Sequence, residues 1–257
     1  MKFFNRFSQV FPAFVVASSV ALVASPATAW EWGWGSKVSG SGTIKTEARN
    51  VSGFTGISLS LPAKVEIVQG IAKGITIESD DNILPLIETV VEDGKLQLRF
   101  KDRNMSVSTK TLKMTVSVKT LDNLAVAGSG DLCAAKLKVA NLKTSIAGSG
   151  DVRIASLDAD TLIVSIAGSG DFSAGGKANA VEGKIAGSGD LKIETLAANS
   201  VKLSIAGSGD AKVWAKEFLK VSIAGSGDVA YYGDAKVTQS VAGSGSVKRL
   251  GNAPTGS

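Results

Sequence analysis

The second half of the chain repeats the tetrapeptide Ala-Gly-Ser-Gly seven times, at intervals of 18 to 20 residues. The copies begin at Ala127, Ala147, Ala167, Ala186, Ala206, Ala224 and Ala242. An aspartate follows each of the first six copies, and Ser246 follows the seventh. A unit of this length cannot bury its apolar face alone, so its copies must stack on one another. The repeat therefore requires an architecture of stacked units.

Side-chain alternation within each copy indicates strands. Ile146, Val152 and Ile154 lie an odd number of residues from Asp151, whereas Ser149 lies two residues before it. A period of two is typical of a strand with one buried face. We therefore expect an all-β fold, a right-handed parallel β-helix or solenoid, with coils of 18–20 residues stacked about 4.8 Å apart over residues 127–250. The repeat's glycines, 14 of the 29 in the chain, fall on inward positions, where a missing side chain allows close backbone packing.

The first half shows the same alternation without the repeated motif. Between residues 38 and 121, Ile57 alternates with Leu59 and Ile75 alternates with Ile77. No linker rich in proline or serine separates this part from the repeats. We expect an irregular β first half that continues into the coils. On this interpretation residues 38–250 form a single β-solenoid domain and residues 251–257 form a tail.

The first 29 residues have the composition of a secretory signal peptide. Lys2 and Arg6 precede an apolar stretch that closes on Ala27-Thr28-Ala29. Cleavage after Ala29 would lower the net charge from +5 to +3, because only Lys2 and Arg6 are lost as charged residues. So mild a charge does not favour nucleic acid as a partner. We expect an exported protein of the periplasm, cell surface or medium, with no transmembrane anchor in the mature chain.

The chain contains no histidine and a single cysteine, Cys133. This composition excludes Ser-His-Asp and Cys-His catalytic arrangements, histidine metal clusters and a disulfide framework. Cys133 falls on an outward position, and we interpret it as an incidental small residue. We expect a non-enzymatic protein. The alternative is a polysaccharide-active β-helix enzyme, in which aspartates on adjacent coils act as acid and base.

The repeated aspartates are the candidate metal ligands. They are Asp131, Asp151, Asp171, Asp190, Asp210 and Asp228. Stacked in register, their carboxylates would form a row, and hard cations such as Ca²⁺ take oxygen ligands of this kind. The alternative is that each carboxylate bonds the backbone of its own turn, while Arg153, Lys192 and Lys212 offset the charge. Ca²⁺ is the only cofactor that the pattern suggests.

Four tryptophans are candidate ligand contacts. Trp30, Trp32 and Trp34 share one face if their segment is extended, and tryptophan presents a large amphipathic surface to a sugar or a protein. The same segment, residues 30–37, could instead cap the open end of the solenoid or form a flexible tail. Trp214 lies in a shorter coil beside Phe218.

Several ordered motifs resemble one known family. They are the stretches NVSGFTGI at 50–57, VEIVQG at 65–70, DNIL at 81–84 and GKL at 94–96, followed by the repeated Gly-Ser-Gly-Asp. From about Ser39 to about Leu250 the chain resembles the putative auto-transporter adhesin head GIN domain family. The resemblance implies a β-helix-like fold in an exported bacterial protein, and adhesion to a glycan or protein of the cell envelope or extracellular space. It supplies no functional residues, and it leaves a homo-oligomer open.

Overall fold

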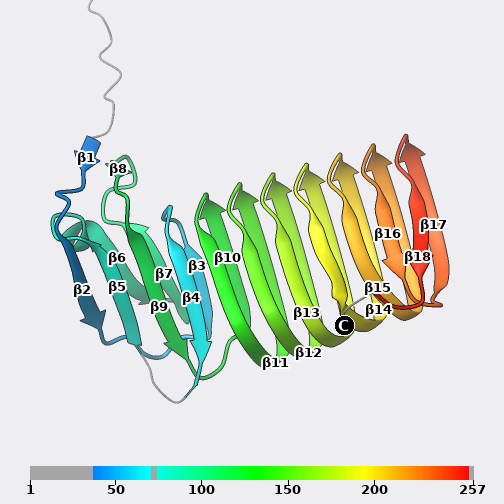
Figure 1. Cartoon of the computed structure of the whole chain (residues 1–257), viewed down its shortest axis with the longest axis horizontal. Coiled ribbons are helices and arrows are strands. Elements are labelled where there is room, and N and C mark those ends of the chain that lie inside the picture. Colours follow the sequence, from blue (N-terminus) through cyan, green and yellow to red (C-terminus); the bar gives the residue numbers. More distant parts are fainter. Residues whose placement is uncertain (1–36, 71–73, 255–257) are drawn as a thin grey trace, which may run out of the picture. The chain divides into compact units, whose positions relative to one another are not determined.

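The structure is a computed structural model that describes residues 37–70 and 74–254, and these residues are almost entirely β (Figure 1). The first half contains β1 (Lys37–Ser39), β2 (Ile44–Arg49), β3 (Gly56–Leu59), β4 (Lys64–Gln69), β5 (Gly74–Asp80), the 3₁₀ helix η1 (Leu84–Leu86), β6 (Ile87–Glu92), β7 (Lys95–Phe100), β8 (Ser106–Ser108) and β9 (Leu112–Val118). The repeat half contains β10 (Asn123–Gly128), β11 (Asp131–Gly148), β12 (Val152–Gly168), β13 (Phe172–Gly187), β14 (Leu191–Gly207), β15 (Ala211–Gly225), β16 (Val229–Tyr232), β17 (Lys236–Gly243) and β18 (Val247–Gly251).

The repeats form the predicted β-solenoid. Each of the strands β11 to β15 runs through nearly a whole coil, and Figure 1 shows these coils stacked side by side. Every neighbouring pair is parallel, and the register joins equivalent residues of successive copies. Ile146 pairs with Ile166, for example, one repeat further along the chain. The all-β solenoid prediction is therefore confirmed.

The core of the solenoid consists of stacked apolar rows. Inward side chains such as Leu132, Leu142 and Ile146 are almost completely buried, whereas the residues between them face outward or are half-buried. Each row continues through the next coil, because equivalent residues are register partners. Thr144 is a buried polar exception in one of these rows.

From the second copy on, the two glycines of each copy are needed for contact between coils. Gly148 has a φ of +127°, and a Cβ built on it would lie 2.4 Å from the carbonyl oxygen of Gly128. A Cβ on Gly150 would lie 2.2 Å from the carbonyl oxygen of Gly130. Real Cβ atoms do not approach backbone so closely, and L-residues rarely adopt that φ. The glycines therefore let consecutive corners stack backbone on backbone.

The first half closes the stack with antiparallel strands. On one side β10 pairs in parallel with β3, β3 with β7, and β7 pairs antiparallel with β6. On the other side β11 pairs in parallel with β4 and β4 with β9, and β5 and β2 then add antiparallel. The predicted irregular β first half thus continues two faces of the solenoid. Residues 1–36, which include the expected signal peptide and Trp30, Trp32 and Trp34, lie outside the described residues.

Candidate functional site

The repeated aspartates form a ladder at the corners of the coils. The Oδ1 atom of each aspartate accepts a hydrogen bond from the backbone N–H of the aspartate in the next coil. The N···O distance is 2.9 Å from Asp171 to Asp151 and 3.0 Å from Asp190 to Asp171. At the end of the ladder, the backbone N–H and hydroxyl of Ser246 both donate to Asp228. The expectation that each carboxylate bonds its own turn is therefore wrong, because the stacked coil offers the donor.

The second oxygen of two aspartates pairs with a cation. Arg153 lies 2.5 Å from Asp151 Oδ2, and Lys192 Nζ lies 2.6 Å from Asp171 Oδ2 and 3.2 Å from Asp190 Oδ2. Burial by itself would raise the pKa of Asp171. The hydrogen bonds from Lys192 and from the backbone N–H of Asp190, together with the nearby positive charges, outweigh burial, so the net effect is a lowered pKa. The hydrogen bond to Asp171 raises the pKa of Lys192. Arg153 and Lys192 thus offset the ladder's charge.

Metal binding by the ladder stays a prediction. The third expected cation, Lys212, has no ion pair within residues 37–70 and 74–254. In that same part of the chain, no group of three or more His, Cys, Asp or Glu side chains is arranged to hold a metal ion. The structure instead assigns the Oδ1 atoms to backbone donors. No cation is needed to explain how these atoms are satisfied.

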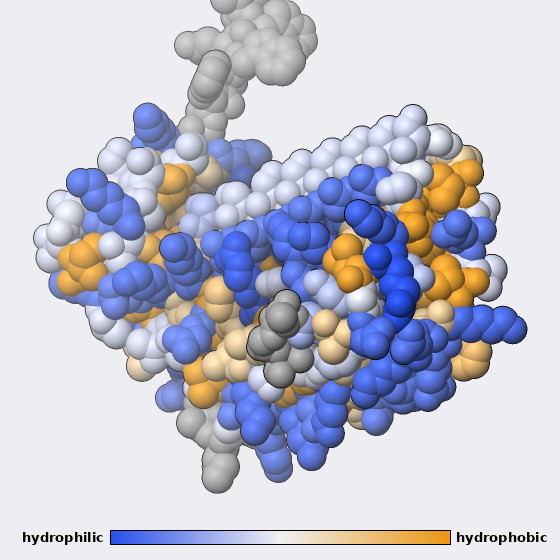
Figure 2. Space-filling model, turned by 45° about the vertical axis from the view of Figure 1, so that its right-hand side comes forward, coloured by the Kyte–Doolittle hydropathy of each residue, from blue (hydrophilic) through white to orange (hydrophobic). Residues whose placement is uncertain are grey.

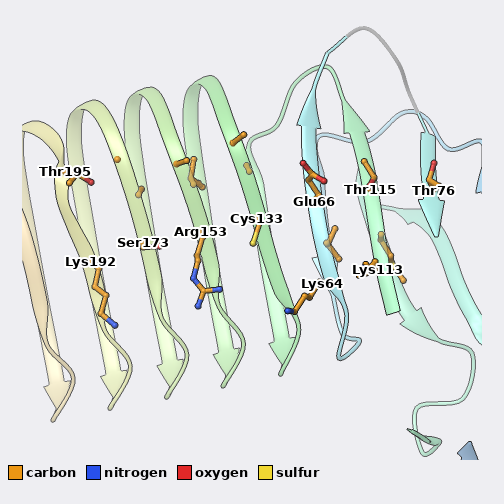
Figure 3. A pocket seen from close by; sticks show the side chains of 18 of the residues that line it. Lys64, Glu66, Thr76, Lys113, Thr115, Cys133, Arg153, Ser173, Lys192 and Thr195 are labelled. Atoms are coloured by element: carbon orange, nitrogen blue, oxygen red, sulfur yellow. The ribbon is translucent and has the colours of Figure 1, made fainter. Parts of the chain in front are cut away.

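A long groove crosses the outer face of the sheet beside the ladder (Figure 3). It has a volume of about 870 Å³ and touches eight consecutive strands, in the order β2, β5, β9, β4, β11, β12, β13 and β14. Eight strands at about 4.8 Å spacing span roughly 34 Å. The groove therefore runs along the axis of the solenoid and could hold an extended chain.

Small side chains make the floor of this groove. Ala135, Ala155 and Gly175 each lie four residues after a repeat aspartate, and all three line the groove. A Cβ on Gly175 would lie 2.9 Å from the carbonyl oxygen of Ala155 and 3.0 Å from Thr195 Oγ1, so this position cannot accept a larger residue without a shift of its neighbours. The register also slips between β12 and β13 and between β13 and β14 near these positions. Small residues and irregular pairing together leave the hollow.

Polar groups line the groove from strands far apart in the sequence. Glu66, Cys133, Arg153, Ser173 and Lys192 face it from consecutive strands, as Figure 3 shows. Cys133 is exposed, which confirms its predicted outward position. None of the predicted site residues lies in this lining. A sequence signal existed nonetheless, because small residues fill the fourth position after the aspartate in the first three coils.

Charges in the groove are only partly compensated. Lys113 Nζ lies 4.0 Å from a carboxylate oxygen of Glu78, and Arg153 and Lys192 pair with the ladder. Lys64 and Glu66 have no ion pair with any described residue. The Oε2 atom of Glu194 is buried and has no hydrogen-bond partner in the described chain. The groove therefore retains one free ammonium and carboxylate oxygens that lack a donor.

Trp214 lies one strand beyond the groove. It is half-buried on β15, with Lys216 Nζ 5.9 Å from the centroid of its ring. Phe218, further along β15, is 55% exposed. Contact of Trp214 with a ligand stays a prediction.

The corners of the coils present a different surface. Figure 2 shows a pale band of weakly polar residues along the edge where the long strands end, with strongly hydrophilic residues beside it. Exposed serines such as Ser149 and Ser169 belong to this edge. Their backbone N–H groups donate to carbonyl oxygens of the preceding coil. In the described part of the chain, no helix is long and apolar enough to cross a membrane.

Solved structures with the same fold come from Bacteroides and Parabacteroides species. A putative adhesin from Bacteroides fragilis is 28% identical, with a TM-score of 0.80, and the match covers 83% of this chain and 100% of that one. A putative lipid binding protein from Parabacteroides distasonis is 26% identical, with a TM-score of 0.72 and coverage of 84% and 100%. A putative adhesin from Parabacteroides merdae, at 24% identity and a TM-score of 0.68, covers 83% of this chain and 99% of its own. No curated protein matches the chain.

The family model described as putative auto-transporter adhesin, head GIN domain, matches residues 53–235. This match includes the first-half motifs except for residues 50–52, the aspartate ladder and all but the first strand of the groove. It confirms the resemblance drawn from the ordered motifs. The chain belongs to the putative auto-transporter adhesin, head GIN domain family.

Proposed function

We propose that this chain is an exported, non-enzymatic protein of the cell envelope that binds a glycan or protein partner through the groove. The observation that carries the proposal is the groove itself, an open channel of about 870 Å³ on a stack of hydrogen-bonded coils. Clefts of this size with a few polar groups are the usual places for ligands. The solenoid supports the groove rigidly, because each lining strand is paired on both sides or closes the sheet.

The adhesin description of the family supports a binding role. The relatives from Bacteroides fragilis and Parabacteroides distasonis, described as an adhesin and as a lipid binding protein, are both named for binding. The repeated aspartates argue against catalysis, because the Oδ1 atoms of five of them accept a hydrogen bond from the next aspartate's N–H and that of the sixth accepts one from Ser246. Active sites depend on a unique arrangement of groups. A repeated structural contact is not such an arrangement.

Binding can be tested with two substitutions in the same coil. Ser173→Trp places a large side chain in the groove, and Ser169→Trp places the same side chain on the exposed corner edge. The purified chain and both variants are immobilised and exposed to envelope glycans, extracellular matrix proteins and the chain itself. We expect at least one partner to bind the parent chain and Ser169→Trp and to be lost with Ser173→Trp. Equal binding by the two variants would rule out the groove as the site.

A further inference from the structure

We propose that the ligand of the groove is a neutral, hydroxyl-rich glycan chain that lies along the solenoid axis, with Glu194 accepting a hydrogen bond from a sugar hydroxyl. This inference rests on the proposed binding role of the groove and names its ligand class. The shape of the groove gives the first argument. A channel that crosses eight strands accommodates an extended polymer better than a compact ligand.

The charges of the groove disfavour an anionic polymer. Arg153 is paired with Asp151, Lys192 with Asp171 and Asp190, and Lys113 lies near Glu78. These cations already have carboxylate partners, so an anionic chain would have to compete for them. Lys64 is the one lining cation without an ion pair in the described chain. Three lining carboxylates, those of Glu66, Glu78 and Glu194, would in addition repel an anion.

The lining also offers an acyl chain no large apolar side chain to pack against. Its apolar members with larger side chains, Val65, Met114 and Ile154, are at most 2% exposed, because their side chains point into the core. The side chains that face the groove are small or polar, among them Thr76, Thr115, Ser173 and Thr195. Pockets for apolar ligands are instead lined mainly by hydrophobic and aromatic side chains.

The unsatisfied groups fit a hydroxyl in particular. The carboxylate of Glu194 lines the groove, and no described residue donates to either of its oxygens. Its Oε2 atom is buried, so Oε1 is the oxygen that a ligand would reach. Lys64 is a free donor, and the threonine and serine hydroxyls can both donate and accept. Sugar hydroxyls also donate and accept, so one kind of group on the ligand can satisfy every unpaired group of the groove. A carboxylate oxygen without a donor is costly once a ligand excludes water, so a sugar hydroxyl that donates to Glu194 Oε1 would favour binding.

Trp214 extends this site by one strand. The fourth position after the aspartate changes from small residues in the first coils to Glu194 on β14 and to Trp214 on β15. The groove ends at β14, so a chain that leaves it would meet the half-exposed indole. Aromatic faces offer large amphipathic contact area to such ligands.

The test uses the full chain and defined soluble probes. Neutral oligosaccharides of glucose, mannose and N-acetylglucosamine are titrated by calorimetry at increasing length, alongside polygalacturonate, heparin and oleate vesicles. We expect a neutral series to bind and affinity to rise with length. Glu194→Gln should weaken that binding about tenfold, the effect of one hydrogen bond to a charged group. Glu182→Gln, which lies outside the groove lining and pairs with Lys184 and Lys202, should leave it unchanged.

The outcomes separate this inference from the binding role. If a partner from the envelope screen is lost with Ser173→Trp but no neutral oligosaccharide binds, the groove is a binding site and the glycan inference is overturned. Binding of polygalacturonate, heparin or oleate alone overturns it as well. Equal effects of Glu194→Gln and Glu182→Gln would remove Glu194 from the site. Circular dichroism of each variant checks that it is folded.

Discussion

Removal of one aspartate side chain from the ladder should measurably lower the free energy of unfolding of the solenoid. In Asp171→Ala, the backbone N–H of Asp190 loses its acceptor at 3.0 Å and Lys192 loses its shorter ion pair. A hydrogen bond to a charged acceptor contributes about 1.5–3 kcal/mol. The ion pair adds at most about 1 kcal/mol, because both side chains are partly exposed and Lys192 keeps Asp190. We therefore expect a loss of about 2–3 kcal/mol.

The assay is urea unfolding at pH 7, followed by circular dichroism. Asp171→Asn keeps an oxygen at the acceptor position and should cost about half as much as Asp171→Ala. Asp160→Ala is the matched control, since Asp160 is exposed and has no hydrogen bond or ion pair with a described residue. It should change stability by no more than about 0.5 kcal/mol. If Asp171→Ala and Asp160→Ala shift the midpoint equally, the ladder does not stabilise the coils.

The remaining predictions concern pH, corner packing and calcium. The pKa of Asp171 is lowered in the folded state, so the charged carboxylate stabilises the fold above its unfolded pKa, and this stabilisation is lost as pH falls through the folded pKa. The free energies of unfolding of the parent chain and Asp171→Ala should therefore converge below about pH 4. Gly170→Ala should lower the free energy of unfolding in urea by about 1–3 kcal/mol, because its Cβ would lie 2.1 Å from the carbonyl oxygen of Gly150. Gly70→Ala is the control and should leave this free energy nearly unchanged, since no atom lies within 4 Å of its Cβ. Calcium and chelator should give the same thermal midpoint, since the Oδ1 atoms already accept backbone donors; a midpoint raised by calcium would show that the ladder binds it.

The coils could be predicted from sequence because their information is local and repeated. The parity of Ile146, Val152 and Ile154 determines which side chains point inward, and the recurrence of the same motif every 18 to 20 residues determines the register between coils. The closing strands of the first half could not be predicted in the same way. Alternation at Ile75 and Ile77 identifies a strand, but it does not reveal that β5 pairs antiparallel with β2 and β9. Partner choice there depends on contacts distant in the sequence.

The aspartate partners and the groove were missed for related reasons. Turn rules consider the chain near one residue, so they assigned the carboxylate of Asp151 to its own turn. In the stack, the N–H of Asp171 is the donor, 20 residues away. The groove likewise arises between coils, where Ala155 and Gly175 lie side by side and the register slips. Only the run of small residues at one repeat position was visible in the sequence.

The ladder and the groove are coupled through the residue two positions after the aspartate. At that position Arg153 and Lys192 line the groove with one part of their side chain and pair with ladder carboxylates through their cationic ends. The ladder therefore does more than satisfy backbone donors, because it neutralises two of the groove's four lining cations. Without these pairs the groove would present two further free cations, which would favour anions. With them, Lys64 and the unpaired Glu194 dominate, and the same repeat that builds the coils also sets what the groove can bind.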